Sequence, residues 1–258
     1  MIVKKFFYLF IFLLLSACAN TEKPSYILTN SELHQYRNGD NLRYGLLNLS
    51  SAADARGTLT YTFESRDLFT PANNFLSVFF LKTDTDGNVN FPFVNTYFTQ
   101  TEDGNLTLEA YSESDKAYWL IEQGNTTTGE VFYNSPLSDI SEKTVIDMPL
   151  QNCPTDISID ICTVSGSTRV DLTPLGTETV DTDYAKFEAY KFNIDWTVNT
   201  DSKLYLISGT QWVYPPLGVV KFNYTITTEL GSNTLIGTLT ATNIKIPAAN
   251  KSASAPSL

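Results

Sequence analysis

The sequence predicts an all-β fold: an antiparallel meander curled into a half-barrel or a β-sandwich, with little helix. Apolar and polar residues alternate with a period of two along several segments, as in strands with one buried and one wet face. Aromatic residues, which favour strands, are abundant, with 14 tyrosines and 16 phenylalanines among 258 residues. Short turns rich in Asn, Asp and Gly separate these segments, so we expect consecutive strands to be antiparallel neighbours.

The clearest strands lie in the C-terminal third of the chain. Residues 190–198 alternate without interruption, and the apolar face of this strand would carry Tyr190, Phe192, Ile194, Trp196 and Val198. Residues 220–227 repeat the pattern, with an apolar face of Val220, Phe222, Tyr224 and Ile226. Between them, Pro215-Pro216 would end one strand and Gly218 would allow a sharp corner. A further strand is expected around residues 235–246, after a turn at Gly231-Ser232-Asn233.

Earlier strands have shorter alternating runs. One is expected around residues 58–63, and a weaker one around residues 106–111, where Leu106, Leu108 and Ala110 would face away from Tyr111. The tripeptides that predict turns are Asn38-Gly39-Asp40, Asp86-Gly87-Asn88 and Asp103-Gly104-Asn105. Only two short helical turns are expected, at residues 29–33 and 135–141.

A sheet with one apolar face must bury that face. Without long helices, it can curl on itself, pack on a second sheet or hold an apolar ligand. An unfilled apolar groove would favour a binding module. A dense aromatic core that includes Phe192, Trp196, Phe222 and Tyr224 would argue against one.

The N-terminus has the features of an export signal. Lys4 and Lys5 precede an apolar run that is shorter than the ~20 residues needed to cross a bilayer. The run ends in Leu15-Ser16-Ala17-Cys18, which resembles the lipobox of bacterial lipoprotein precursors. The resemblance implies cleavage before Cys18 and acylation of this cysteine, with two or three chains giving stable anchoring.

These features predict four segments and a location. Residues 1–17 would be the signal peptide, 18–25 the lipidated cysteine and tether, 26–246 the β-rich domain and 247–258 a flexible tail. Residue 19 is Ala rather than the Asp that is typical of inner-membrane retention. We therefore expect a lipid-anchored protein of the bacterial outer membrane that faces the periplasm.

Net charge and cysteine spacing argue against two kinds of function, nucleic-acid binding and redox chemistry. The net charge of −11 argues against nucleic acid as a partner. Once Cys18 is acylated, Cys153 and Cys162 remain, nine residues apart, and a disulfide between them is the simplest expectation in an oxidising compartment. Free thiols and a redox-active pair are the alternatives, but the spacing is not Cys-x-x-Cys and no basic group flanks either thiol.

No motif for catalysis, a metal or a cofactor stands out. A serine-type triad needs a histidine base, and the one histidine, His34, lies in no recognised motif. Asp84, Asp86 and Asn88 form a weak calcium candidate, but they fit a hairpin turn better because the glycine and glutamate positions of a calcium loop are not matched. We expect no enzyme activity. A hydrolase that uses two converged carboxylates about 5–10 Å apart is the remote alternative.

Two stretches of the C-terminal third resemble a known group of proteins. They are Asp183-Tyr184-Ala185-Lys186-Phe187-Glu188-Ala189-Tyr190-Lys191 and Gln211-Trp212-Val213-Tyr214-Pro215-Pro216-Leu217-Gly218-Val219-Val220-Lys221. Together with residues 36–44, they resemble uncharacterised β-rich bacterial outer-membrane lipoproteins of the TapB-like group. The resemblance implies a curled antiparallel sheet and transfers no chemistry. One glycine of the group's Gly-Val-Gly corner is replaced here, where the chain reads Pro216-Leu217-Gly218.

The leading expectation is an envelope lipoprotein with a structural, assembly or interaction role, anchored by its lipid and with a possible protein partner in the envelope. The rival expectation is a module that binds a lipid or an acyl chain on a concave apolar face.

Overall fold

The fold is that of a computed structural model, which describes residues 23–50, 55–69, 75–87, 95–113, 116–120, 129–154, 163–200 and 203–246. The strands are β1 (Ser25–Tyr26), β2 (Asn41–Asn48), β3 (Ala55–Phe69), β4 (Phe75–Gly87), β5 (Asn95–Gln100), β6 (Leu106–Glu113), β7 (Lys116–Leu120), β8 (Glu130–Tyr133), β9 (Thr144–Pro154), β10 (Thr163–Asp181), β11 (Lys186–Asn199), β12 (Leu204–Tyr214), β13 (Gly218–Thr228) and β14 (Gly231–Thr242). One 3₁₀ turn, η1, spans Leu137–Asp139.

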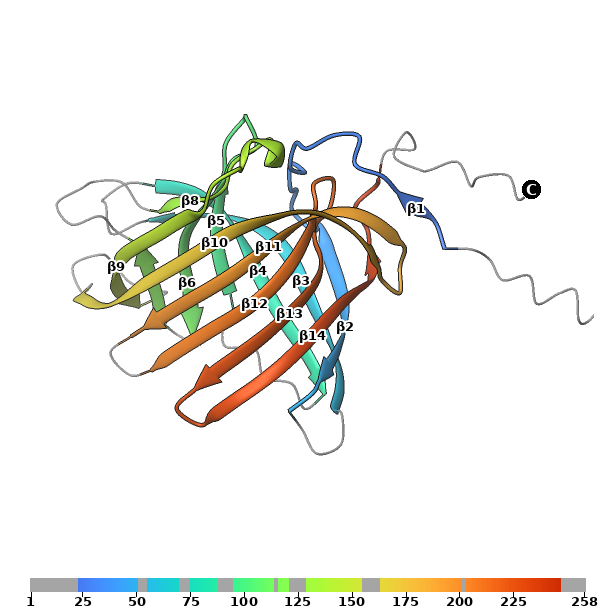
Figure 1. Cartoon of the computed structure of the whole chain (residues 1–258). Coiled ribbons are helices and arrows are strands. Elements are labelled where there is room, and N and C mark those ends of the chain that lie inside the picture. The colour runs from blue at the N-terminus through green and yellow to red at the C-terminus, as the bar shows by residue number, and fades with distance from the viewer. Residues whose placement is uncertain are drawn as a thin grey trace, which may run out of the picture.

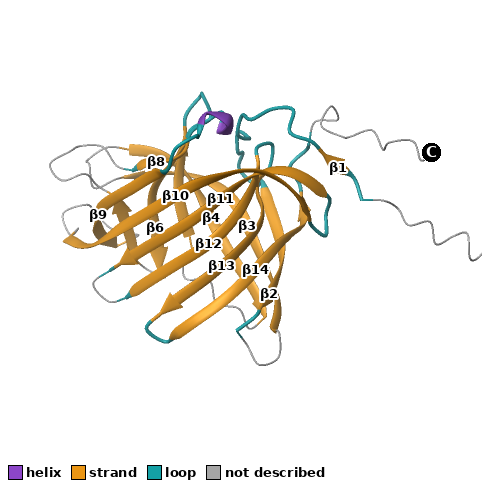
Figure 2. Cartoon of the chain, viewed as in Figure 1, coloured by secondary structure: helices purple, strands orange, loops and turns teal. Residues whose placement is uncertain are grey.

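The strands form one antiparallel meander (Figures 1 and 2). Apart from β8, which pairs with β6, each strand from β2 to β14 pairs with the next one along the chain. The first and last strands of this series, β2 and β14, also pair, with Leu235 opposite Asn48 and Thr242 opposite Leu42. The predicted all-β, curled antiparallel meander is confirmed, and this last pairing closes the sheet on itself.

The predicted alternation is confirmed in the C-terminal strands. In β11 the side chains of Phe192, Ile194 and Val198 are buried, whereas those of Asn199 and Asp195 are exposed. In β13, Val220, Phe222, Tyr224 and Ile226 are buried, as expected. The corner before β13 is also confirmed, because β12 ends at Tyr214 and Gly218 has a φ of 97°.

Two details differ from the sequence-based expectation. Gly231-Ser232-Asn233 belongs to β14, and the two preceding residues, Glu229 and Leu230, form the hairpin turn. In β6, Tyr111 lies on the same side of the sheet as Leu108, because a bulge at Glu109 inserts one extra residue into the pairing with β5. The bulge reverses the alternation for the rest of the strand.

Some of the predictions for short turns are confirmed, and others are wrong. The helical turn expected at residues 135–141 is present as η1, and Asp103-Gly104-Asn105 forms the turn between β5 and β6, with Gly104 at a φ of 89°. Residues 29–33 are not helical. Within the described part of the chain, no helix is long and apolar enough to cross a membrane.

The start of the described chain is held against the sheet. Lys23 forms an ion pair with Asp181 at 3.0 Å, and the Pro24 carbonyl accepts a hydrogen bond from the Lys186 amide. β1 then adds to β11 as a short parallel strand. The last residues assigned to the tether from the sequence are therefore in contact with the domain.

The segment between β1 and β2 crosses one end of the closed sheet. Leu33 and Tyr36 are buried there. The His34 amide donates to the Pro215 carbonyl at 2.8 Å, and the His34 carbonyl accepts from the Gln100 side chain at 2.8 Å. We call residues 31–36 the end cap, because they join the β12–β13 corner to the β5–β6 turn across the opening of the sheet.

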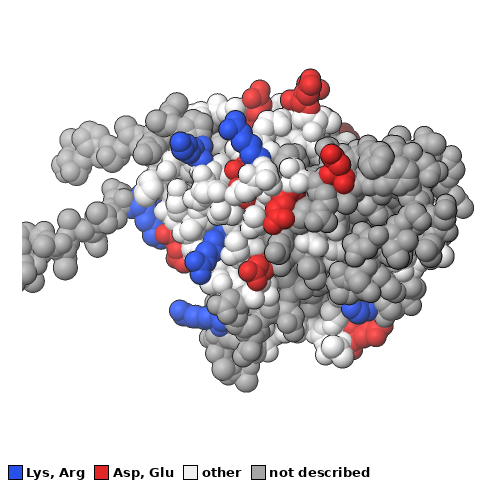
Figure 3. All heavy atoms as spheres, turned by 180° about the vertical axis from the view of Figure 1, so that it is seen from behind, with Lys and Arg blue, Asp and Glu red and all other residues white. Residues whose placement is uncertain are grey.

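Charged side chains lie mainly on the outer surface. On the face seen in Figure 3, most of the described basic side chains lie toward the side where the described chain begins and ends, and described acidic side chains lie both among them and farther away. On the outer face of β9 and β10, Arg169 forms ion pairs with Asp147 at 2.7 Å and with Asp171 at 3.1 Å.

Candidate functional site

An apolar cavity of about 130 Å³ lies inside the closed sheet. Its aromatic lining consists of Tyr36, Tyr44, Tyr61, Phe63, Phe98, Phe132, Tyr133, Trp196, Phe222 and Tyr224. Most of its other described lining residues are aliphatic, and none of the described lining residues is acidic or basic. The cavity is close in volume to the ~150 Å³ apolar cavity that holds benzene in an engineered protein.

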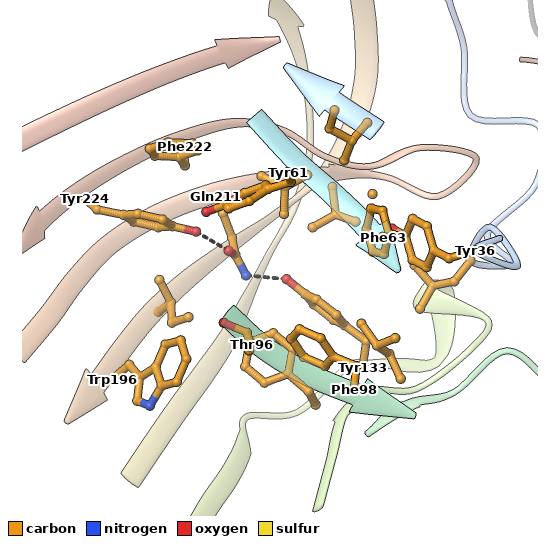
Figure 4. A pocket seen from close by; sticks show the side chains of 18 of the residues that line it. Tyr36, Tyr61, Phe63, Thr96, Phe98, Tyr133, Trp196, Gln211, Phe222 and Tyr224 are labelled. Carbon is orange, nitrogen blue, oxygen red and sulfur yellow. Dashed lines mark hydrogen bonds between the residues drawn. The ribbon is translucent and has the colours of Figure 1, made fainter. Parts of the chain in front are cut away.

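The inner aromatic residues surround the cavity without filling it. Phe222 stacks on Tyr224 with ring centroids 4.7 Å apart, and both rings form part of the wall (Figure 4). Phe192 is not among the described lining residues, and its ring packs edge-on against Tyr133 with centroids 5.6 Å apart. The aromatic core expected from the sequence is therefore present together with an unfilled apolar space.

One polar cluster interrupts this apolar wall. Gln211, from β12, is only 3% exposed. Its Nε2 donates a hydrogen bond to the Tyr133 hydroxyl, from β8, and its Oε1 accepts one from the Tyr224 hydroxyl, from β13 (Figure 4). We call these three residues the amide cluster. Burying an amide costs free energy unless the amide is hydrogen-bonded. The hydrogen bonds with the two tyrosines therefore allow Gln211 to occupy this buried position.

The tyrosines of the wall stay uncharged at neutral pH. Burial raises the pKa of Tyr133 and of Tyr224 well above the ordinary value, and neighbouring tyrosines raise both further. The hydrogen bond with Gln211 lowers the pKa of Tyr133, but burial has the larger effect. Burial likewise raises the pKa of Tyr61. The cavity therefore presents hydroxyl and amide groups and no formal charge.

The end cap closes the cavity on one side. Leu33 and Tyr36 belong both to the cap and to the cavity wall. Tyr36 stacks on Phe63 with centroids 3.9 Å apart and planes 9° apart, and its hydroxyl donates to the Leu217 carbonyl at 3.3 Å. Because the cap is bonded to two different turns, it can open only if several hydrogen bonds break together.

The cysteines predicted from the sequence fall in different places. Cys153 is buried in β9, opposite Ala117 of β7. Cys18 and Cys162 lie outside the described residues, so acylation of Cys18 and the pairing of Cys153 with Cys162 stay predictions.

The other candidate residues are not among the described lining residues of the cavity. Asp84 is exposed in β4; Asp86 is in the same strand, and Asn88 lies outside the described residues. The described residues contain no group of three or more His, Cys, Asp or Glu side chains that could hold a metal ion. His34 lies in the end cap, where its Nε2 is 2.9 Å from Asp40 Oδ2 and its ring packs edge-on against Tyr36.

Sequence reasoning missed the amide cluster. Gln211 occupies an inward position in an alternating strand, between the buried residues Ile207 and Val213. A polar residue at such a position is a signal that can be read from the sequence. Its partners, however, come from strands that lie 78 and 13 residues away in the chain, and only the closed sheet brings them together.

Comparison with known proteins yields two structures of loose similarity. No protein-family model and no curated protein matches the chain. One crystal structure, of a predicted exported protein with a YmcC-like fold from Bacteroides fragilis, has a TM-score of 0.38 and 13% identity over 83% of this chain and 99% of its own. A predicted lipoprotein from Parabacteroides distasonis has a TM-score of 0.32 and 10% identity over the same shares. Resemblance to the TapB-like group stays a prediction.

Proposed function

We propose that this chain is a lipid-anchored envelope protein whose domain binds a small apolar ligand inside its closed sheet. The observation that carries the proposal is the aromatic cavity of about 130 Å³. Protein interiors are normally packed without voids of this size, because each void forfeits dispersion contacts and costs stability. Ligand sites are typically concave, apolar and fitted with a few polar groups, as this cavity is.

The anchor predicted at Cys18 would hold the capped end of the domain near the membrane. Ser25 comes seven positions after Cys18, and an extended chain spans at most about 3.6 Å per residue, or about 25 Å in total. β1 lies at the same end of the sheet as the end cap, because Tyr214 at the β12–β13 corner donates to the Ile27 carbonyl. An apolar ligand that leaves the membrane would therefore meet this end first.

A filled-cavity variant tests the proposal. A chain of residues 19–258 contains every strand of the closed sheet, so its melting temperature can be followed with benzene as the probe. We expect benzene to raise the melting temperature of the wild type, because a ligand that binds only the folded state stabilises it. Ile207→Phe should abolish this rise, because Ile207 lines the cavity.

Leu206→Phe is the matched control. Leu206 is the next residue in β12 and is 39% exposed on the outer face, so the same added ring leaves the cavity unchanged. A wild type that does not respond to benzene would refute the proposal, and so would an Ile207→Phe protein that responds as the wild type does. Native mass spectrometry of the domain from its own host would then identify the natural ligand by mass.

An interaction or assembly role in the envelope is the second candidate. Leu204 and Leu206 are exposed on the outer face of β12, and Leu230 at the tip of the β13–β14 turn is fully exposed. Exposed apolar side chains can mark a protein–protein interface, because a partner that covers them removes them from water. Replacing Leu206 and Leu230 with Ser should remove cross-links to an envelope partner, and cross-linking that is unaffected would contradict this role for the surface.

A further inference from the structure

The amide cluster retains hydrogen-bonding capacity toward the cavity. A glutamine amide has two N–H donors and two carbonyl lone pairs, and a tyrosine hydroxyl both donates and accepts. Gln211 gives one N–H to Tyr133 and takes one proton from Tyr224. This leaves one N–H and one lone pair on Gln211, and the O–H of Tyr133, for a further partner.

The number of free hydrogen-bonding groups is the same for either orientation of the Gln211 side-chain amide. If the oxygen and nitrogen of Gln211 are exchanged, Tyr133 donates to the carbonyl and Tyr224 accepts from the nitrogen. One amide N–H and one tyrosine O–H then still remain, the hydroxyl now being that of Tyr224. All three residues belong to the cavity wall.

None of the described lining residues is charged, and this limits which ligand groups can enter the cavity. A carboxylate or phosphate inside this cavity would lose its hydration, and none of those residues is a Lys, Arg or His that could compensate it. An ammonium group would likewise find no described carboxylate in the wall. A charged group would therefore have to stay outside.

We infer that the ligand carries one uncharged oxygen-containing group, a hydroxyl or a carbonyl, which Gln211 and its two tyrosines bind while a benzene-sized apolar part fills the cavity. This inference rests on the proposed function. It makes Gln211 the residue that determines specificity, and it makes the aromatic wall responsible for most of the affinity. A ligand that lacks the oxygen would leave the remaining donors of the cluster without a partner.

Three probes of the same ring size separate these contributions. Calorimetric titration of residues 19–258 with benzene, phenol and benzoate varies only the polar group. We expect phenol to bind about tenfold more tightly than benzene, the ratio that one well-made hydrogen bond supplies. Benzoate should show no measurable binding, because its charge has no counterion in the wall.

Two variants test whether the amide cluster causes the preference. Gln211→Leu keeps the approximate size of the side chain and removes the amide, and Tyr133→Phe removes a single hydroxyl. Both should reduce the ratio of the affinity for phenol to the affinity for benzene. Tyr133→Phe decides the question if Gln211→Leu does not fold. Ser208→Ala, on the exposed face of β12, is the control that should retain the preference.

The outcomes separate the inference from the proposed function. Equal affinities for benzene and phenol in the wild type would overturn the inference while leaving an apolar site intact. A preference for phenol that survives both Gln211→Leu and Tyr133→Phe would also overturn it, as would benzoate binding as tightly as phenol. Failure of benzene and phenol alike to bind would refute the proposed function and the inference with it.

Discussion

Gly237 lies directly opposite Phe222 in the β13–β14 pair, and the Phe222 ring occupies the space that a side chain at position 237 would need. The same ring forms part of the cavity wall and stacks on Tyr224. A glycine in the middle of a strand usually weakens it, but here it allows an aromatic ring to lie flat against the backbone. The volume of the cavity therefore depends on a residue that does not line it.

The first prediction concerns Gly237→Ala. The added methyl group would overlap the Phe222 ring, which must tilt toward the cavity. We expect the free energy of unfolding to fall by about 1–3 kcal/mol, as in overpacked cores, and benzene affinity to fall as the space shrinks. Urea unfolding and calorimetry measure the two effects. Thr238→Ala, at the neighbouring position on the other face, is the control, and a Gly237→Ala protein that matches it in both measurements would contradict the prediction.

The second prediction concerns the joint between the end cap and the β12–β13 corner. Gly218 has a φ of 97°, and a Cβ there would overlap the hydroxyl of Tyr36. Gly218→Ala thus combines backbone strain with a steric clash, and we expect it to cost more than the ~1 kcal/mol that an incompatible φ alone costs.

Gly176→Ala separates these two costs. Gly176 has a similar φ of 86°, but apart from its two chain neighbours no described residue has an atom within 4 Å of the position of its Cβ. The free energy of unfolding should therefore fall less for Gly176→Ala than for Gly218→Ala. Equal losses would show that the packing of Tyr36 over Gly218 contributes nothing to stability.

The third prediction follows from the buried tyrosines. Burial raises the pKa of Tyr36, Tyr44, Tyr61, Tyr133 and Tyr224 above the value of ~10 that they have in the unfolded chain. Below pH ~10 these groups are protonated in both states and stability does not depend on them. As the pH rises through ~10 toward the higher folded values, only the unfolded chain loses protons, so the free energy of unfolding falls.

The loss is about 1.4 kcal/mol per pH unit for each such tyrosine, so alkaline unfolding should be steep. Tyrosinate absorbance and near-ultraviolet circular dichroism, recorded together, measure it. The buried tyrosines should ionise only when the dichroism signal is lost. A protein that ionises all of its tyrosines near pH 10 while it keeps a native signal would contradict the prediction.

The sequence predicted well those parts of the fold that depend on local alternation. Residues 190–198 and 220–227 alternate without a break, so the inward positions of Phe192 and Phe222 could be read directly. The position of Tyr111 could not be read in this way. It depends on the bulge at Glu109, which exists only in register with β5, and strand register is set by the partner as well as by the strand.

For the same reason, neither the closure of the sheet nor the candidate site could be predicted from the sequence. The closing pair joins Leu235 to Asn48, and no pattern near either residue specifies the other. The sequence required that the apolar face be covered, but it did not distinguish a filled interior from an open one. That difference depends on how rings such as Trp196 and Phe222 lie once the sheet has closed.

The fourth prediction is the disulfide between Cys153 and Cys162. Cys153 is buried in β9, and Cys162 is the other cysteine that remains once Cys18 is acylated. An even pair of cysteines in an oxidising compartment most simply forms a disulfide. We expect the bond to stabilise the domain by about 2–3 kcal/mol.

Peptide mapping by mass spectrometry without reductant checks the bond, and unfolding with and without reductant checks its effect on stability. A double Cys153→Ala, Cys162→Ala variant should unfold like the reduced wild type and should not respond to reductant. Two alkylatable thiols in the untreated protein would rule the bond out.

The fifth prediction concerns the anchor. Cys18→Ser removes the sulfur that would carry the lipid, so the protein should lose its processed, acylated form and its lipid-mediated attachment to the membrane. Fractionation of the envelope and intact mass measure these changes. Asn20→Ser, two residues further along, is the control and should leave the processed form in the membrane. A Cys18→Ser protein that is still processed and still membrane-bound would refute lipid anchoring.

A substitution at the next position tests which membrane holds the protein. Aspartate after the acylated cysteine is the usual signal for inner-membrane retention, and the chain has Ala19 there. Ala19→Asp should therefore move the protein from the outer-membrane to the inner-membrane fraction without changing its acylation or its folded domain. Because the tether would be unchanged in length, the capped end of the sheet would face the inner membrane at the same distance. Wild type and Ala19→Asp proteins found in the same fraction would contradict the predicted outer-membrane location.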